Sequence, residues 1–417
     1  MKRILFTLTI LITSSGFLCA QLTPEVTSWV INPDTAVNKG YGGIPSNVQL
    51  VQYSTDYVYI SCTCIPGYDI GPWPGNPNTP ANQNFVYKIT RSPQANTGAL
   101  TAVGLGHVGV WTNGVSIFNA SDAMTYNNDG VWHRNAYYFE GPGFDNCLGH
   151  PQQQGEYHHH VSPTCLYDAT DSIHHSPLIG FMFDGYPVYG TYGYINPLDS
   201  TSGLRRIRSS YQLRNITQRD TLPDGAAASA VGPAVNSSYP LGAFMEDYKY
   251  IPGSGDLDSN NGRFCITPQY PNGTYAYFVT VDSTGSPAYP YTSGANYYGV
   301  VTASDIGMGS GHNTITESTT TYTPNASSGI NELPATIKYE LYPNPTKDYA
   351  FIYFDPSNPN NMKGSLYNEQ GQLLQQINNL QPSISYTLDL SKYASGVYFL
   401  HLESDQVGVV EKIVKTE

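Results

Sequence analysis

Short runs of apolar and aromatic residues alternate with turn residues along most of the chain. The runs 57–60 and 275–279 are examples, and Gly, Pro and Asn cluster on either side of such runs. Short runs rich in Tyr, Val and Ile and bounded by turn residues predict β-strands rather than helices. The pattern extends from about Leu22 to Asp305, so we expect a mainly β region there.

The pattern changes near Ala303. Residues 303–338 are rich in Ser, Thr and Gly, which predicts an extended linker. Residues 339–417 then return to regularly spaced strand candidates, at 350–354, 364–368, 385–389 and 397–403. Short strands at this spacing are typical of a small immunoglobulin-like β-sandwich. The predicted fold class is therefore all-β, with an irregular β-rich central domain over residues 21–302 followed by this sandwich.

Residues 1–20 have the layout of a secretory signal peptide. Lys2 and Arg3 precede an apolar run over residues 4–12, and a short stretch ending at Ala20 leads into polar Gln21. No later stretch approaches the roughly 20 apolar residues that a membrane helix needs. We therefore expect a chain that is exported through the inner membrane and has no transmembrane segment.

Composition and charge narrow the range of partners. Of the 417 residues, 35 are Tyr, 40 are Gly and 30 are Pro, only 12% are charged, and the net charge is −13. Nucleic acids and anionic membranes both bind basic surfaces, because cationic side chains displace counterions or attract lipid headgroups. For an acidic chain we therefore expect no nucleic-acid partner.

Five cysteines remain once the signal peptide is removed. In an exported protein their default state is a disulfide. Cys147 and Cys165 bracket a histidine-rich segment, so a bridge between them is the simplest pairing. Cys265 could pair with Cys62 or with Cys64, and either pairing would leave one thiol free.

Most of the histidines lie in one window, from His133 to His175. If residues 156–161 form a strand, His158 and His160 point to one face and Tyr157 and His159 to the other. Imidazoles spaced in this way can both reach one metal ion. His150 and His175 are the best-placed candidates for further ligands.

Four other residues are candidates for supporting roles near the histidines. Glu156 and Tyr157 would lie beside an open metal position, where a metal-bound water could act as a nucleophile. Asp184 could orient a ligand histidine, and Asp145 would support the loop. Neutral imidazole suits several divalent transition metals, among which we expect Zn or Cu first. Two alternatives remain open, a hydrogen-bonded histidine cluster without metal and an unspecialised surface.

The chain also resembles itself. Residues 258–280 repeat the Asp, Gly and Tyr positions of residues 145–162, which indicates a duplicated strand-turn-strand unit. The second copy has Arg263 for His150, Ala276 for His158 and Phe278 for His160. The retained residues would then be scaffold, and the replaced residues the site.

These segments also resemble the YHYH protein family over roughly residues 104–281. The likeness rests on Tyr157-His158-His159-His160, on Asp-x-Cys-x-Gly-His at 145–150, on His-Ser-Pro at 175–177 and on Asp-Gly-x-Pro-x-Tyr-Gly at 184–190. Two positions depart from the family pattern: His159 replaces the second Tyr of the motif, and Asn260 stands where the family often has Cys. The resemblance implies an architecture and a site but no reaction.

Residues 339–417 are similar to the type A C-terminal sorting domain of the type IX secretion system. The matching elements are Leu-Tyr-Pro-Asn-Pro at 341–345, Leu-Tyr-Asn-Glu-Gln-Gly at 366–371, Ala-Ser-Gly-Val-Tyr-Phe at 394–399 and Glu-Lys-Ile-Val-Lys at 411–415. The resemblance implies a Bacteroidetes-like bacterium, type IX machinery as a partner, and removal of the domain. The protein would then be secreted or held at the outer-membrane surface.

Two functions therefore compete. The first is an exported protein whose central domain binds a divalent transition metal. The second is a binding module without enzymatic activity, in which the tyrosines form an aromatic platform for glycans or surface proteins. The sequence contains no Gly-x-Ser-x-Gly, P-loop or His-Glu-x-x-His motif, so the simplest hydrolase and nucleotide-binding interpretations are excluded and the question of an enzyme stays open.

Overall fold

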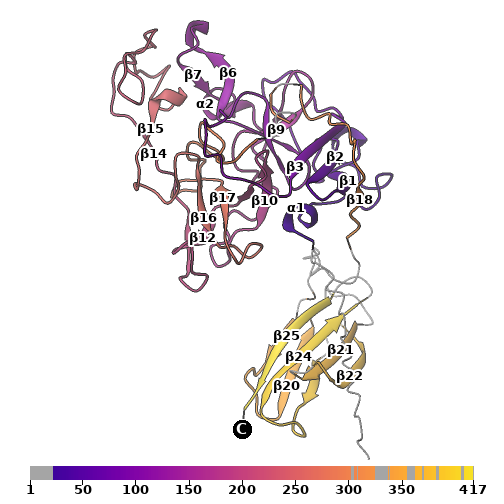
Figure 1. The fold of residues 1–417 in the computed structure, drawn as a ribbon. Coiled ribbons are helices and arrows are strands. Elements are labelled where there is room, and N and C mark those ends of the chain that lie inside the picture. The colour runs from indigo at the N-terminus through magenta and orange to yellow at the C-terminus, as the bar shows by residue number, and fades with distance from the viewer. Residues whose placement is uncertain are drawn as a thin grey trace, which may run out of the picture. The chain divides into compact units, whose positions relative to one another are not determined.

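The computed structural model describes residues 22–301, 305–307, 309–324, 337, 339–354, 362–368, 371–381, 385–404 and 408–416 (Figure 1). The expected signal peptide lies outside the described residues. The chain forms two compact units, Met1–Pro324 and Asn325–Glu417. Both are built from strands, so the predicted all-β fold class is confirmed. Within the described ranges, no helix has the length and apolar character of a membrane span.

An eight-stranded sheet forms the centre of the first unit, in the order β16-β17-β11-β10-β4-β5-β9-β8. Its strands are β4 (His107–Trp111), β5 (Ser116–Phe118), β8 (His150–Pro151), β9 (Tyr157–His159), β10 (Leu178–Met182), β11 (Pro187–Tyr189), β16 (Gly262–Cys265) and β17 (Thr274–Phe278). All residues of β4, β5, β9, β10 and β11 are buried. The middle of the sheet is therefore covered on both faces and holds the side chains of β8 and β9 on a rigid base.

The sheet consists of two similar halves that meet where β4 pairs antiparallel with β10. In each half an antiparallel hairpin (β4–β5 or β10–β11) is joined by a parallel strand (β9 or β17), which pairs antiparallel with an outer strand (β8 or β16). His150 pairs with His158 in the first half, and Arg263 pairs with Ala276 in the second. These are the positions exchanged between the two sequence segments, so the structure confirms the internal duplication.

Equivalent contacts in the two halves hold the loop before each outer strand. The hydroxyl of Tyr157 donates a hydrogen bond to Asp145 (2.9 Å), and Tyr275 makes the same bond to the aspartate of its own half (2.9 Å). A Cβ atom on Gly149 or Gly262 would lie 2.3 Å from the hydroxyl oxygen of the corresponding tyrosine. Both loops therefore require glycine, and the positions that the two segments share are scaffold.

A second sheet of the same unit has the order β18-β1-β2-β3, with strands β1 (Val48–Tyr53), β2 (Tyr57–Cys62), β3 (Phe85–Thr90) and β18 (Thr320–Thr321). β18 lies within the segment expected to be a linker. The Asp305 carboxylate accepts a hydrogen bond from the backbone N–H of Lys88 (3.1 Å), and Asn313 donates one to the carbonyl of Val86 (2.8 Å). The described residues up to Pro324 therefore belong to the first unit. Their composition did not reveal this, because strands can pair through their backbones whatever their side chains are.

Short elements complete the first unit. In the described part of this unit the helices are α1 (Pro24–Thr27) and α2 (Ala136–Phe139), and 3₁₀ turns span Tyr41–Gly43, Tyr126–Asn128, Gly141–Gly143 and Met245–Asp247. Three two-stranded ribbons pair β6 (Ser121–Thr125) with β7 (His133–Asn135), β12 (Tyr192–Tyr194) with β13 (Leu204–Arg206), and β14 (Tyr211–Leu213) with β15 (Tyr248–Tyr250). Asn135 begins α2 by accepting a hydrogen bond from the Tyr137 backbone N–H.

The cysteines of the first unit fall into two groups. Cys147 and Cys165 form a disulfide, as predicted. Cys62, Cys64 and Cys265 are buried free thiols, so neither of the two pairings considered for Cys265 is formed.

The second unit has two sheets, β19-β20-β23 and β22-β21-β24-β25. The strands are β19 (Tyr339–Tyr342), β20 (Tyr349–Phe354), β21 (Met362–Asn368), β22 (Leu373–Leu380), β23 (Ser385–Asp389), β24 (Gly396–Glu403) and β25 (Gly408–Lys415). Side chains of β20 alternate between exposed and buried, and the buried ones share a core with Leu366, Leu388 and Leu400. Two sheets around one core form the predicted small β-sandwich.

Candidate metal centre

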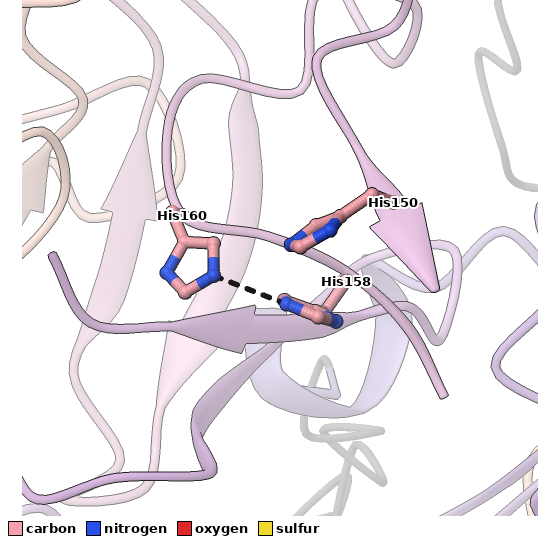
Figure 2. Close-up of side chains that lie close together, drawn as sticks. All are labelled: His150, His158 and His160. Atoms are coloured by element: carbon pink, nitrogen blue, oxygen red, sulfur yellow. Dashed lines mark hydrogen bonds between the residues drawn. The ribbon is translucent and has the colours of Figure 1, made fainter. Parts of the chain in front are cut away.

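Three histidine side chains meet at the outer end of the first half-sheet (Figure 2). His150 lies on β8, His158 on β9 and His160 directly after β9, and one ring nitrogen of each lies within 4.8 Å of the others. Strand alternation places His158 and His160 on one face, and the pairing with β8 brings His150 to them. The ring of His159 packs instead against that of Tyr157, with the ring centroids 5.2 Å apart.

Backbone carbonyls determine which nitrogen of two rings carries hydrogen. The Nδ1 atom of His158 lies 3.1 Å from the carbonyl oxygen of Glu156, and that of His160 lies 2.5 Å from the carbonyl oxygen of Asn119. A carbonyl oxygen can only accept, so both Nδ1 atoms donate and both Nε2 atoms keep a lone pair. These Nε2 atoms face each other at 3.1 Å. Two lone pairs at this distance repel each other unless a proton or a metal ion lies between them.

Burial keeps two of these rings uncharged. His150 is 6% exposed and His158 is 2% exposed. Burial, aided by the neighbouring imidazoles, lowers the pKa of His150 to about 4 and lowers the pKa of His158 well below its usual value. Both rings are therefore neutral at pH 7, which is the form that binds a metal ion.

A carboxylate, Glu140, lies beside the cluster at the end of α2. Its Oε2 atom is 3.2 Å from Nε2 of His160 and 3.6 Å from Nε2 of His150. Burial acts to raise the pKa of Glu140, but the contact with His160 and the charge of Arg134 outweigh it and the pKa is lowered. Among the described residues, Oε2 of Glu140 and Nε2 of His150 are buried without a hydrogen-bond partner. Two buried, unpaired ligand atoms beside a pair of facing lone pairs fit the requirements of a bound cation.

Glu140 was not among the residues predicted for the site. It lies at the end of a single-turn helix, in no periodic relation to the histidines. Its only sequence signal was its position between Asn135 and Asp145, within the segment that resembles the YHYH family.

The cluster forms part of the wall of a cavity of about 540 Å³. His150, His158, His160 and Glu140 all line it. The ring of Phe118 stacks on that of His158, with centroids 3.8 Å apart. The site is therefore held in a fixed geometry on the sheet side and is accessible from the cavity, which lies in the size range of small-molecule sites.

Glu156 and Tyr157, expected beside an open metal position, direct their side chains elsewhere. The Tyr157 hydroxyl is hydrogen-bonded to Asp145, which supports the loop before β8 as a scaffold residue. The Glu156 carboxylate lies 3.1 Å from Nδ1 of His107. Glu156 reaches the cluster only through its backbone carbonyl, which orients the ring of His158.

Asp184 belongs to the second half of the sheet. It accepts hydrogen bonds from the hydroxyl of Tyr277 (2.6 Å) and from the backbone N–H of Gly299 (2.8 Å). The expectation that it orients a ligand histidine is therefore corrected, because its carboxylate is occupied by a tyrosine and a backbone amide.

His175 also lies in the second half, apart from the other three histidines. Its ring packs against Tyr189 (5.2 Å) and Phe278 (6.3 Å), and Phe278 occupies the position equivalent to His160. The structure therefore does not bring His175 to the cluster. Proximity along the sequence did not reveal that the chain crosses to the other half-sheet between residues 160 and 175.

Comparisons with known proteins agree with this division of the chain. Residues 86–289 match the family model described as YHYH protein, and residues 340–416 match the one described as secretion system C-terminal sorting domain. No curated protein matches the chain. The first match contains the three clustered histidines and Glu140, and the second supports export as cargo of the type IX secretion system. The central domain therefore belongs to the YHYH protein family, and the chain ends in a type IX C-terminal sorting domain.

Proposed function

We propose that the YHYH domain binds one divalent transition metal ion through His150, His158 and His160, with Glu140 as a fourth ligand. The observation that carries this proposal is the approach of two Nε2 lone pairs to 3.1 Å, both oriented by backbone carbonyls. Bonds of about 2.05 Å at a tetrahedral angle place two ligand nitrogens about 3.3 Å apart. The histidines therefore need only a small adjustment to hold an ion.

The donor set favours Zn or Cu over Mg or Ca. Three imidazoles and one carboxylate supply nitrogen-rich coordination, whereas Mg and Ca select oxygen ligands. No cysteine lies in the cluster, and the three free thiols are buried elsewhere in the described residues. A metal ion at this position would supply a Lewis acid on the wall of the cavity, while the protein would fix the three rings and exclude water from the sheet side.

Metal analysis of the secreted protein tests the proposal. Wild-type protein is purified from the culture medium or the cell surface, and its metal content is measured by plasma mass spectrometry beside the variant His158→Ala/His160→Ala. The control is His133→Ala/His174→Ala, whose side chains are 46% and 73% exposed and lie outside the cluster. We expect stoichiometric metal in the wild type and the control and none in the cluster variant.

Equal metal content in all three proteins would refute the proposal, as would its absence from correctly folded wild type after exposure to Zn²⁺ and Cu²⁺. Near-ultraviolet circular dichroism establishes that each variant is folded. The alternative of a binding module without metal would then stand.

Export is tested separately. We propose that the protein crosses the outer membrane through the type IX machinery, is freed of its sorting domain, and stays at the surface or is released. Immunoblotting of cell fractions follows this path, and the surface fraction or medium should contain a protein shorter than the full chain.

A further inference from the structure

We call the cavity lined by His150, His158, His160 and Glu140 the metal cavity. A second cavity, of about 520 Å³, adjoins it. Its lining includes the rings of Tyr137, Tyr138, Tyr248 and Tyr291 and contains no charged side chain. Aromatic rings bind apolar faces, and their hydroxyl groups bind polar edges. A lining of this kind suits an uncharged ligand that has both.

The two cavities are separated by one short segment that contains α2. Pro142 lines both cavities, and Glu140 lines the metal cavity while Tyr138 lines the second. Phe144 lines the second cavity, and its ring centroid lies 4.8 Å from that of His150 on the other side of the wall. The wall is therefore about one side chain thick, and a chain-like ligand passing over Pro142 would contact both cavities.

Side-chain amides are prominent among the polar groups that line the metal cavity. Four side-chain amides contribute to it, from Asn76, Asn78, Gln152 and Gln153. Among the described residues that line it, the acidic side chains are Asp122 and Glu140, and no Lys or Arg is present. Amides offer both donors and acceptors, which matches hydroxyl groups, and Asp122 is already paired with Arg134 (2.8 Å), so the described lining offers no free cationic side chain in this cavity for a phosphate, sulfate or uronate group.

We propose that the two cavities together form one binding site for an uncharged oligosaccharide. A sugar ring has an apolar C–H face for the tyrosines and hydroxyl groups for the amides, and successive units would reach from the second cavity to the metal. The inference rests on the proposed metal site, because it places the ligand against that ion. A peptide fits less well: the edge strand at the cavity, β8, has two residues, and Pro151 has no N–H with which to pair an added strand.

Binding of defined oligosaccharides tests the inference on the metal-loaded secreted protein. The probes are neutral hexasaccharides of glucose, mannose and N-acetylglucosamine, their monosaccharides, and a hexameric uronate, each measured by calorimetry. We expect at least one neutral hexasaccharide to bind at least tenfold more tightly than its monosaccharide, and more tightly than the uronate.

Two variants locate the ligand. Tyr138→Ala should weaken binding of the hexasaccharide about tenfold, equivalent to about 1.4 kcal/mol, because its ring is 37% exposed and lines the second cavity. The matched control is Tyr353→Ala, whose ring is also 37% exposed but lies in the sorting domain, and it should leave binding unchanged. In protein purified without its sorting domain, Tyr57→Ala on β2 serves as the control.

The outcomes separate this inference from the proposed metal site, because metal content is measured on the same samples. Stoichiometric metal without binding of any neutral hexasaccharide would overturn the inference alone. Preference for the uronate or for peptides, or an equal loss in both tyrosine variants, would also overturn it. Oligosaccharide binding by protein that holds no metal would support the saccharide site and contradict the metal site.

Discussion

Replacing Gly149 with alanine should weaken metal binding, although Gly149 is not itself a ligand. A Cβ atom at this position would lie 2.3 Å from the hydroxyl oxygen of Tyr157 and 2.9 Å from a ring nitrogen of His159. Gly149 directly precedes His150 on β8, so the loop cannot relax without moving that ligand. The internal duplication supplies a matched control, because a Cβ on Gly262 would lie 2.3 Å from the hydroxyl oxygen of Tyr275.

Both substitutions overpack a buried contact and should cost a similar amount of folding free energy. Overpacking in a closed core costs about 1 to 3 kcal/mol, and both tyrosines are almost fully buried, Tyr157 at 0% and Tyr275 at 3%. Only Gly149→Ala moves a ligand histidine. Changes to residues that orient ligands lower metal affinity by about 10- to 100-fold, so we expect this loss in Gly149→Ala and not in Gly262→Ala.

Two measurements separate the effects. Urea unfolding of the metal-free proteins gives the free energy of unfolding of each variant, and competition with a chromophoric zinc chelator gives the metal affinity. Equal losses of zinc affinity in the two variants would contradict this prediction, because they would show that general destabilisation, and not displacement of His150, weakens the site.

Three further predictions follow from individual groups. Glu140→Gln should lower zinc affinity at least about tenfold in the chelator assay and should also lower the unfolding free energy of the metal-free protein, because the lowered pKa of this carboxyl means that its charge favours the folded state; unchanged affinity would exclude Glu140 as a ligand. Burial raises the pKa of Asp184 from 3.8 to about 6, so the stability this group contributes is present below about pH 4 and lost as the pH rises through 6. The free energy of unfolding of wild type minus that of Asp184→Asn should therefore fall by up to about 3 kcal/mol between pH 4 and pH 7, and a pH-independent difference in urea titrations would contradict this. Deletion of residues 339–417 should leave the protein in the periplasm, and unchanged surface display in a protease-accessibility assay would show that another segment directs export.

The parts of the fold that follow from local pattern could be predicted from the sequence. Turn-bounded aromatic runs became β2 and β17, and the regular spacing near the C-terminus became the two-sheet sandwich. The duplication was visible because both copies keep the tyrosine that hydrogen-bonds the aspartate, Tyr157 with Asp145 in the first, and the glycine that leaves room for it, Gly149. The hairpins β4–β5 and β10–β11 belong to the same repeat and share glycines at equivalent positions, Gly109 with Gly180 and Gly114 with Gly185, but glycine is so frequent in this chain that these pairs alone did not reveal the repeat.

The site was only partly predictable, for physical reasons. His158 and His160 follow from strand alternation, and His150 from its equivalence to Arg263 in the second copy. Glu140 reaches the cluster from a one-turn helix, where no periodicity relates it to the strands. His175 was misplaced because sequence proximity does not show which half of a duplicated sheet a residue joins.

The metal coordination itself is the most direct test of the account. X-ray absorption spectroscopy of the zinc-loaded protein measures the number and type of ligand atoms around the ion. We predict three imidazole nitrogens and one carboxylate oxygen at about 2.0 to 2.2 Å, with the imidazole scattering lost in His158→Ala/His160→Ala. A first shell of oxygen atoms alone, unchanged in that variant, would contradict the central claim.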